Sequence, residues 1–222
     1  MSPRTPKAGQ GSATGAKRGR PSAPRNLEPL GGRRSRDQEV VETAVRLFSE
    51  NGYAATSVRD IADALGMLKG SLYYYIDTKE TLLRKIFETS HEQVQEIAER
   101  HRTGDAPPVE RLHAFLEEYA LWYLTHLQRA ILFAREWRHA SDDLRETMAA
   151  QRRYYDDVVE EMIQAIGDAG ELDPELDTKL ATYFVMSAVS SLPDWYKPKG
   201  RQSPQAVAKR YADMAIKMFV AG

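Results

Sequence analysis

From residue 35 to the C-terminus, apolar residues recur at the three- and four-residue intervals of α-helices, and this pattern disfavours a sheet-based fold. Val40, Ala44, Leu47 and Phe48 form the first stripe, and the pair Asn51-Gly52 behind it is a typical helix end. Later stripes of the same kind continue to about residue 220, and serine or aspartate stands in front of several of them. The sequence therefore predicts an all-α protein.

Two short helical patterns follow the first stripe and meet at a glycine. The first begins at Ser57 and Asp60, whose spacing is close to that of a capping box, and it ends at Gly66. The second holds Leu72 and Ile76 on one apolar face. Two short helices that are joined by a tight glycine turn, with a helix before and a helix after, form the helix–turn–helix arrangement.

Three consecutive tyrosines lie in the second short helix, and neighbouring residues of a helix point about 100° apart. If Leu72 and Ile76 face the core, the opposite side of the helix is exposed and enters the major groove of DNA. That side consists of Lys69, Gly70, Tyr73 and Tyr74, with Tyr75 between the two faces. The alternative is an aromatic cluster that packs on another helix, but the glycine turn and the flanking lysines favour a DNA-reading surface.

The stretch FSENGYAATSVRDIADALGMLKGSLYYYIDTKETLL closely resembles the N-terminal domain of TetR-family repressors, and the match extends from about Glu39 to Leu83. The resemblance implies a homodimeric, ligand-responsive transcriptional repressor that binds a double-stranded DNA operator. Two residues depart from the family pattern. Leu68 stands where the family usually has a capping Ser, and Ile76 replaces the usual Phe.

The same resemblance assigns roles to individual residues. Phosphate contacts fall to Ser57, Arg59, Tyr73, Tyr74, Tyr75 and Lys79, and base-edge contacts fall to Lys69, Gly70 and Ser71. These residue types suit the roles, because a tyrosine hydroxyl donates to phosphate and its ring packs on a sugar or a thymine methyl.

Residues 1–34 differ in charge from the rest of the chain. They carry eight Lys or Arg residues and one Glu, a net charge of +7, which leaves −8 for the remainder of a chain whose total is −1. Their low apolar content predicts a disordered basic arm. Within it, Arg18-Gly19-Arg20-Pro21 resembles the AT-hook, whose arginines (here Arg18 and Arg20) lie in the minor groove of A·T-rich DNA. A solubilising tail with general phosphate affinity is the alternative.

The charge of the arm matters because residues 35–83 contain five basic residues against eight acidic ones. Affinity for phosphates depends on the counterions that cationic side chains release, so this segment alone supplies little of it. We therefore expect the arm to add non-specific affinity for DNA.

The chain divides into three expected parts: the arm at 1–34, a helix–turn–helix domain at 35–83 whose last helix continues to about residue 102, and a ligand-binding and dimerisation domain at 84–222. The resemblance implies that the helices near residues 177–192 and 204–220 pair with a second subunit in a four-helix bundle. Small residues along the first of these helices suit close packing of this kind. An intramolecular core fits the same residues and remains the alternative.

The C-terminal part is richer in aromatic residues than a plain helical bundle requires. The candidate effector-binding residues are Trp122, Phe133, Trp137, Tyr154, Tyr155 and Phe184, with Arg152 and Arg153, and also Arg138, as nearby cations. Each aromatic ring also fits a role in the core. The runs DWYKPKG and ELDPELD are similar to those of actinobacterial family members that regulate sterol or fatty-acid catabolism and bind acyl-CoA thioesters. Drug-sensing members have equally aromatic pockets, so the effector class stays open.

Other classes of protein find little support. The chain has no Cys, which excludes disulfides, thiolate nucleophiles and Cys-based zinc sites. No run approaches the roughly 18 apolar residues of a membrane span, and no signal peptide precedes the helices, so we expect a cytoplasmic protein. His91-Glu92 begins like a zinc-binding H-E-x-x-H motif but lacks the second His, and no catalytic or cofactor motif is found. A non-enzymatic helical adaptor that uses the basic arm to bind anionic partners is the alternative to a repressor.

Overall fold

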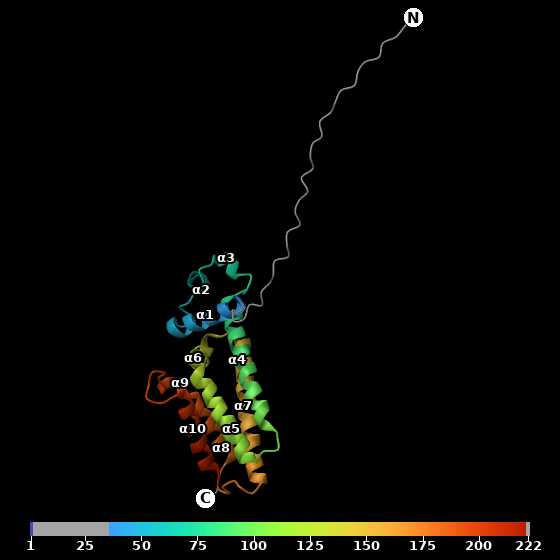
Figure 1. Cartoon of the computed structure of the whole chain (residues 1–222), viewed down its shortest axis with the longest axis vertical. Helices are drawn as coiled ribbons and strands as arrows, with labels where there is room; N and C mark the ends of the chain where they lie inside the picture. Colours follow the sequence, from blue (N-terminus) through green and yellow to red (C-terminus); the bar gives the residue numbers. More distant parts are fainter. Residues whose placement is uncertain (2–35, 221–222) are drawn as a thin grey trace. The chain divides into compact units, whose positions relative to one another are not determined.

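The computed structural model describes Met1 and residues 36–220, and the second range is almost entirely helical (Figure 1), which confirms the predicted all-α fold class. Its elements are α1 (Arg36–Asn51), α2 (Val58–Ala64), α3 (Lys69–Leu72), α4 (Lys79–Arg102), α5 (Pro108–Thr125), α6 (Leu127–Arg135), the 3-10 helix η1 (Trp137–His139), α7 (Asp142–Asp168), α8 (Thr178–Ser190), α9 (Leu192–Trp195) and α10 (Pro204–Phe219). Extended pairing within residues 36–220 is limited to a single antiparallel bridge between Leu172 and Val220.

Side-chain caps explain where several of the helices begin. The Asp60 N–H donates to Ser57 Oγ (3.2 Å), and the Ser57 N–H donates to the Asp60 carboxylate (2.7 Å), so the predicted capping box is confirmed. At α7 and α10 the hydroxyls of Ser141 and Ser203 accept the N–H groups of Leu144 and Ala206, so these two serines are N-caps, as expected from the sequence. Gly66 adopts a positive φ of 65° and allows the tight turn that separates α2 from α3.

Helix α8 begins later than one sequence signal suggested. The pair Asp173-Pro174 is a typical helix start, because Pro suits the first helical position, but α8 does not begin there. The Asp177 carboxylate accepts the N–H of Leu180 at 2.9 Å, so the helix begins at Thr178. Asp173 instead lies in the preceding loop, where its N–H donates to the carbonyl oxygen of Phe219 at 2.9 Å.

Two hydrophobic clusters organise the described residues. One is built from α1–α3 and the start of α4, with Phe48 and Leu72 at its centre, and it also includes Leu132, Ala140 and Leu144 from farther along the chain. The other is built from the second half of α4 and the helices from α5 to α10. Since α4, α6 and α7 pack in both clusters, these three helices connect the helix–turn–helix to the C-terminal bundle.

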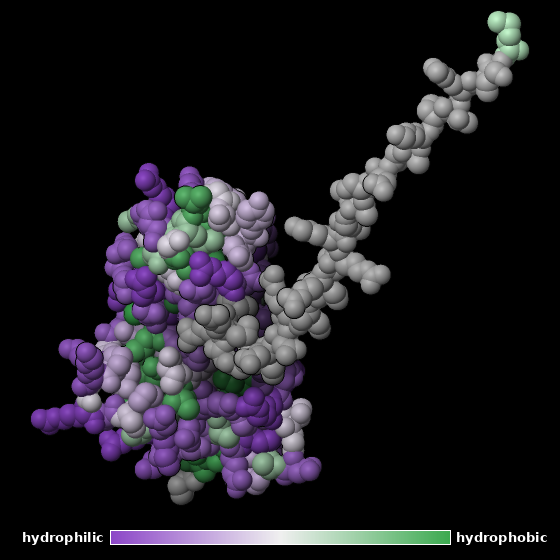
Figure 2. Space-filling model, turned by 45° about the horizontal axis from the view of Figure 1, so that its top comes forward, coloured by the Kyte–Doolittle hydropathy of each residue, from purple (hydrophilic) through white to green (hydrophobic). Residues whose placement is uncertain are grey.

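In the C-terminal bundle, α5 is central and packs against α10, α4 and α7 (Figure 1). Across residues 36–220, no helix is both long enough and apolar enough to cross a membrane. On the face drawn in Figure 2, apolar residues form separate patches in a mostly hydrophilic surface. On such a surface, exposed apolar side chains and spaces left by the packing are the candidates for function.

Candidate nucleic-acid interface and internal cavity

The exposed side of α3 and the turn after it carries most of the residues that are predicted to contact DNA. Leu72 and Ile76 are buried, at 0% and 5% exposure, so the opposite side faces solvent. Tyr74 is 89% exposed and Tyr73 is 46% exposed, whereas Tyr75 is half-buried, so the predicted division into two exposed tyrosines and one between the faces is confirmed. The rest of this face consists of Lys69 and Gly70, which are exposed, and Ser71, which is half-buried. These side chains are accessible to a partner that lies across α3.

Helix α3 is shorter than the sequence pattern suggested. The pattern placed Ile76 inside the helix, but the regular helix ends at Leu72 and the three tyrosines lie in the turn that follows. There the N–H groups of Tyr74 and Tyr75 donate to carbonyl oxygens three residues back, at 3.3 and 2.9 Å. Two features explain the early end: Leu68 at the N-cap makes no side-chain cap bond, and a glycine inside the helix costs about 1 kcal/mol relative to alanine.

Lys79 has an internal role in the structure. Its ammonium donates to the carbonyl oxygens of Tyr53 (2.8 Å) and Thr56 (3.0 Å) and lies 4.2 Å from the centre of the Tyr53 ring. Burial lowers the pKa of Lys79, and the nearby Glu136 carboxylate opposes this shift. Because an ammonium has three donors, one remains for a phosphate, and the predicted phosphate contact stays a prediction.

The remaining predicted DNA contacts lie on α2 or outside the described residues. Ser57 is occupied as the N-cap of α2, while its side chain stays at the surface. Arg59 forms an ion pair with Asp63 at 3.7 Å, but its side chain is 78% exposed, so water weakens the pair and leaves the guanidinium accessible. Arg18 and Arg20 of the AT-hook-like sequence lie outside the residues that the structure describes.

A cavity of about 370 Å³ lies in the C-terminal bundle, among α4, α5, α6, α7 and α8. Its walls are mainly aromatic and aliphatic. Five of the predicted effector-binding residues line it: Trp122, Phe133, Trp137, Arg152 and Tyr155. Three do not, namely Tyr154, Arg153 and Phe184, and neither does Arg138, whose guanidinium lies 5.8 Å from the centre of the Trp137 ring.

The direction of each side chain explains this division. Tyr154 and Tyr155 are neighbours on α7 and therefore point to different sides of the helix. Tyr155 faces the cavity, whereas the Tyr154 hydroxyl donates to the Glu99 carboxylate of α4 at 2.5 Å. Burial and this carboxylate raise the pKa of Tyr154 to about 12. Phe184 is 57% exposed on the other face of α8.

One edge of the cavity is polar, and hydrogen bonds between its side chains fix their positions. The Tyr155 hydroxyl lies 2.6 Å from His91 Nδ1 and 3.0 Å from the His91 carbonyl oxygen. Burial lowers the pKa of His91 and raises that of Tyr155, which favours a neutral ring and a protonated hydroxyl. The Tyr119 hydroxyl donates to the Tyr123 hydroxyl at 3.2 Å. These four side chains are therefore polar but uncharged.

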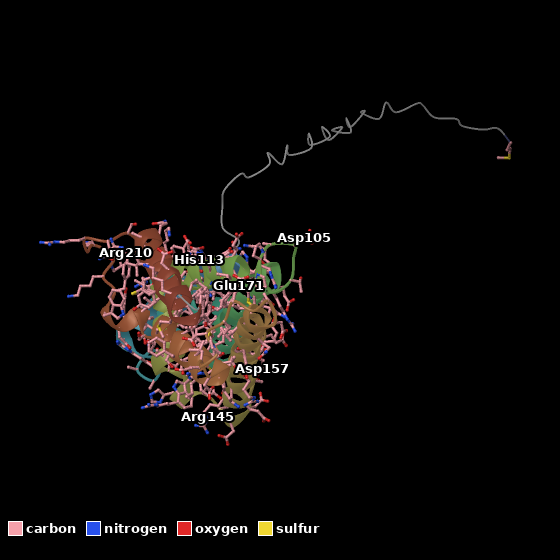
Figure 3. All side chains as sticks on the ribbon, turned by 90° about the horizontal axis from the view of Figure 1, so that it is seen from below. Asp105, His113, Arg145, Asp157, Glu171 and Arg210 are labelled. Carbon is pink, nitrogen blue, oxygen red and sulfur yellow. The ribbon has the colours of Figure 1, made fainter. Side chains whose placement is uncertain are left out.

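Asp156 is the exception at this edge. Its Oδ1 atom is buried and has no hydrogen-bond partner among the described residues, and burial raises its pKa while Arg152 opposes the shift. The sequence reasoning missed Asp156, although a signal existed. Arg145, Ala149, Arg152 and Asp156 recur three or four residues apart and so share one face of α7. Arg145, labelled in Figure 3, lies at the periphery of the described structure. The other cavity-lining residues that were missed include His91, Tyr119, Tyr123, Met148, Gln151 and Met186.

Helices α8 and α10 expose large apolar side chains that have no role in either cluster. They are Leu180, Tyr183 and Phe184 of α8 and Met214 and Met218 of α10, with exposed fractions from 44% to 65%. These positions lie in the two helices that were expected to pair with a second subunit. Monomers rarely expose so many apolar residues on adjoining helices, so a surface of this kind indicates an interface.

Both helical parts of the chain match models of known families. Residues 40–86 match the family model described as "Bacterial regulatory proteins, tetR family", and residues 105–219 match "Tetracyclin repressor-like, C-terminal domain". The HTH-type transcriptional repressor KstR2 of Mycobacterium tuberculosis (strain ATCC 25618 / H37Rv) is 31% identical over 191 residues, which cover 82% of this chain and 92% of the relative.

The chain belongs to the TetR family.

Solved structures of TetR-family proteins show the same architecture. The structure of the ketosteroid transcriptional regulator KstR2 of Mycobacterium tuberculosis aligns with a TM-score of 0.80 at 24% identity, covering 86% of this chain and 98% of the other. AibR in complex with isovaleryl coenzyme A and operator DNA aligns with a TM-score of 0.71 at 28% identity, covering 84% and 98%.

The family membership confirms the resemblance found in the sequence. This TetR-family protein is a helix–turn–helix transcriptional repressor, and its relatives are transcriptional regulators. The roles of individual residues and the boundaries of the three expected parts stay predictions.

Proposed function

We propose that this TetR-family repressor binds its operator as a homodimer and is released from it by an acyl thioester of the coenzyme A type. The observation that carries this proposal is the cavity itself. It lies against α4, and the same helix continues into the helix–turn–helix cluster. A ligand in the cavity therefore touches the element that positions the DNA-reading surface.

The DNA-binding half of the proposal rests on the face formed by Lys69, Gly70, Tyr73 and Tyr74, which is exposed and opposite a buried apolar side. Two such faces are needed to dock in successive major grooves, about 34–36 Å apart. The apolar surface of α8 and α10 supplies a place for the second subunit. Small changes in the distance between two reading faces prevent both from docking at once, and this gives a mechanism for release.

The effector class follows from the size and lining of the cavity. A volume of about 370 Å³ is near the lower end of the range for ligand pockets, about 300–1,000 Å³. This size and the mainly apolar lining suit an acyl group.

In this proposal the nucleotide part of such a thioester lies outside the cavity. Arg152 and Arg145 line the cavity and are exposed, so both can reach its phosphate groups. Arg145 also pairs with Asp142, and this ion pair is weak because both side chains lie in water. AibR, 28% identical, was solved with isovaleryl coenzyme A, and a fatty acid metabolism regulator of Bacillus subtilis is 24% identical over 157 residues, which supports this class of effector.

The cavity is proposed to bind its ligand without transforming it. Ser90 and His91 both line the cavity, but they are not arranged as a nucleophile and its base. The Ser90 hydroxyl donates to the Ile86 carbonyl oxygen at 2.7 Å, and His91 Nδ1 contacts the Tyr155 hydroxyl. Both groups are thus engaged elsewhere.

The proposal is tested with operator DNA that the protein itself selects from a random pool. Octanoyl coenzyme A and isovaleryl coenzyme A are then added, with free coenzyme A as the control. We expect at least one thioester to weaken operator binding at micromolar concentration and free coenzyme A to have no effect. The variant Ala149→Trp, which fills one side of the cavity, should lose this response and keep operator affinity.

Two results would contradict parts of the proposal. If neither thioester binds the protein by calorimetry, the effector class is wrong and the repressor assignment stands. If no sequence is enriched from the random pool, the adaptor alternative is favoured, since an adaptor that binds anionic partners through its charge has no operator preference.

A further inference from the structure

Arg129 on α6 is the only charged residue in the buried core of residues 36–220, at 7% exposure. Arginine keeps its charge at any physiological pH. Burial of that charge is unfavourable unless specific partners offset it, and removal of one partner is usually destabilising. The partners of Arg129 therefore indicate what the protein gains from this charge.

The guanidinium of Arg129 joins three helices. Its Nη2 atom donates to Glu42 Oε1 of α1 at 2.5 Å. Its Nη1 atom donates to Thr89 Oγ1 and Ser90 Oγ of α4, both at 3.3 Å. One planar group thus links α6 and α4 of the C-terminal bundle to the first helix of the helix–turn–helix cluster.

The same residues adjoin the effector cavity. Ser90 lines it, and so do Ala130 and Phe133, which lie one and four residues beyond Arg129 on α6. The Phe133 ring also stacks on Phe87 of α4, with 4.5 Å between ring centres. A ligand that displaces these walls must move the groups that hold Arg129.

Helix α6 is suited to such a movement. It has nine residues, its N-terminus has no side-chain cap, and it is followed by the short 3-10 helix η1. Its buried Leu132 packs in the helix–turn–helix cluster. The helix therefore has one side on the cavity and another on α1, and a shift of α6 is felt on both.

We propose that Arg129 is a positioning residue for operator binding, which transmits occupancy of the cavity to α1 through Glu42. In this role it acts on the DNA-reading surface through the packing of α1 and touches neither DNA nor effector. This link between Arg129 and Glu42, called the bridge, rests on the proposed function, in which a ligand in the cavity controls operator binding. Two tests separate the bridge from the effector class, because one depends on the acyl thioester and the other does not.

The variants separate the bridge from general stability. Glu42→Gln keeps the shape of a side chain that is 46% exposed and removes only its charge, so we expect it to fold. Arg129→Lys keeps the charge but not the fork that reaches two helices at once. Glu50→Gln is the matched control, because Glu50 also lies on α1 and pairs with Arg46, a surface arginine, at 3.2 Å.

The first measurement is the factor by which saturating octanoyl coenzyme A raises the operator Kd. We expect this factor to fall about tenfold or more in Glu42→Gln and in Arg129→Lys, and to stay at the wild-type value in Glu50→Gln. The Kd of octanoyl coenzyme A for each DNA-free protein should change less than about threefold. The proposal is overturned if octanoyl coenzyme A raises the operator Kd of Glu42→Gln by the same factor as in the wild type, while the circular dichroism of the variant shows a wild-type fold.

The second measurement needs no effector. Coupling between two sites is reciprocal, so operator binding must also alter the cavity wall. We expect operator DNA to change backbone hydrogen exchange in residues 86–94 and 127–135 of the wild type, and to change it much less in Glu42→Gln. If operator DNA leaves the hydrogen exchange of these residues unchanged in the wild type, the bridge is overturned, whatever the effector is. A change in the wild type that Glu42→Gln loses supports the bridge even if octanoyl coenzyme A fails to bind, and in that case the effector class alone is wrong.

Discussion

The DNA-reading surface and the effector cavity are built in opposite ways. The reading surface comes from about twenty consecutive residues, between Ser57 and Lys79, and its key side chains point into solvent. The cavity draws its walls from five helices between Ser90 and Ser190, and its side chains point inward. Single substitutions in the reading surface can therefore change DNA binding with little effect on folding. The cavity depends on how distant helices pack, so its ligand and its stability are linked.

The sharpest test of this difference is the pair of substitutions Lys69→Ala and Tyr74→Ala. Each removes an exposed side chain, so we expect each to cost about 1–3 kcal/mol of operator-binding free energy, and the double variant to lose about 25-fold or more in operator affinity. Thermal unfolding and effector binding should stay at wild-type values, because neither side chain packs in a cluster.

Tyr74→Phe is the matched control for this pair, since it keeps the ring and removes the hydroxyl. Full loss in Tyr74→Phe assigns the contact to the hydroxyl, and no loss assigns it to the ring. Wild-type operator affinity in the double variant, measured by gel shift, would remove the reading surface from the position proposed for it.

Lys79 combines features of both sites, because it lies in the DNA-binding region but its ammonium is bound to backbone carbonyls inside the protein. Lys79→Met should remove two charge-assisted hydrogen bonds to the Tyr53 and Thr56 carbonyls and cost about 1.5–3 kcal/mol of the free energy of unfolding. Arg59→Ala, which removes an exposed cation from α2, should leave stability unchanged and weaken operator binding. The measurement is urea unfolding at fixed protein concentration, and equal stability of the two variants contradicts the internal role of Lys79.

These cases show how far the sequence could predict the molecule. The capping box, the glycine turn and the division of the three tyrosines into two exposed ones and one between the faces depend on residues within a few positions of one another, so local rules predicted them. The early end of α3 was missed, because a weakly capped helix with an internal glycine stops where local energies nearly balance. In the C-terminal part, the spacing on α7 could have indicated Asp156, but only packing decides that Phe184 faces outward while Trp122 faces the cavity.

The basic arm at residues 1–34 lies outside the described residues, and its contribution to DNA affinity can be tested by deletion. Deletion of residues 1–34 removes a net charge of +7 from each subunit. If two of these cations per subunit lie near phosphates, the dimer neutralises four, and the slope of log K against log salt should flatten by about 3–4 units. Operator affinity at low salt should fall about tenfold or more, while the preference between operator sequences should persist. An unchanged slope would make the arm irrelevant to DNA binding.

Substitution within the AT-hook-like sequence tests whether the arm binds the minor groove specifically. Arg20→Ala should weaken binding mainly to operators flanked by A·T tracts, whose narrow minor groove attracts arginine. The matched control is Arg25→Ala, a cation of the same arm outside the four-residue motif. An equal loss for both variants on all operators indicates general phosphate affinity in place of minor-groove binding.

The smallest expected effect concerns Leu68, the N-cap of α3. Its backbone already has the extended conformation of an N-cap (φ −69°, ψ 141°), but its side chain makes no cap bond and is 80% exposed. Leu68→Ser should therefore add a bond to a free N–H of the first turn without loss of packing, and stabilise the protein by about 0.5–2 kcal/mol. Operator affinity should rise by no more than the same free energy, because a preformed α3 costs less to order on DNA. Leu68→Ala, which shortens the side chain but adds no cap, is the control. If both variants bind the operator more than tenfold more weakly, Leu68 contacts a base directly, and its exposure then serves specificity at the cost of a cap.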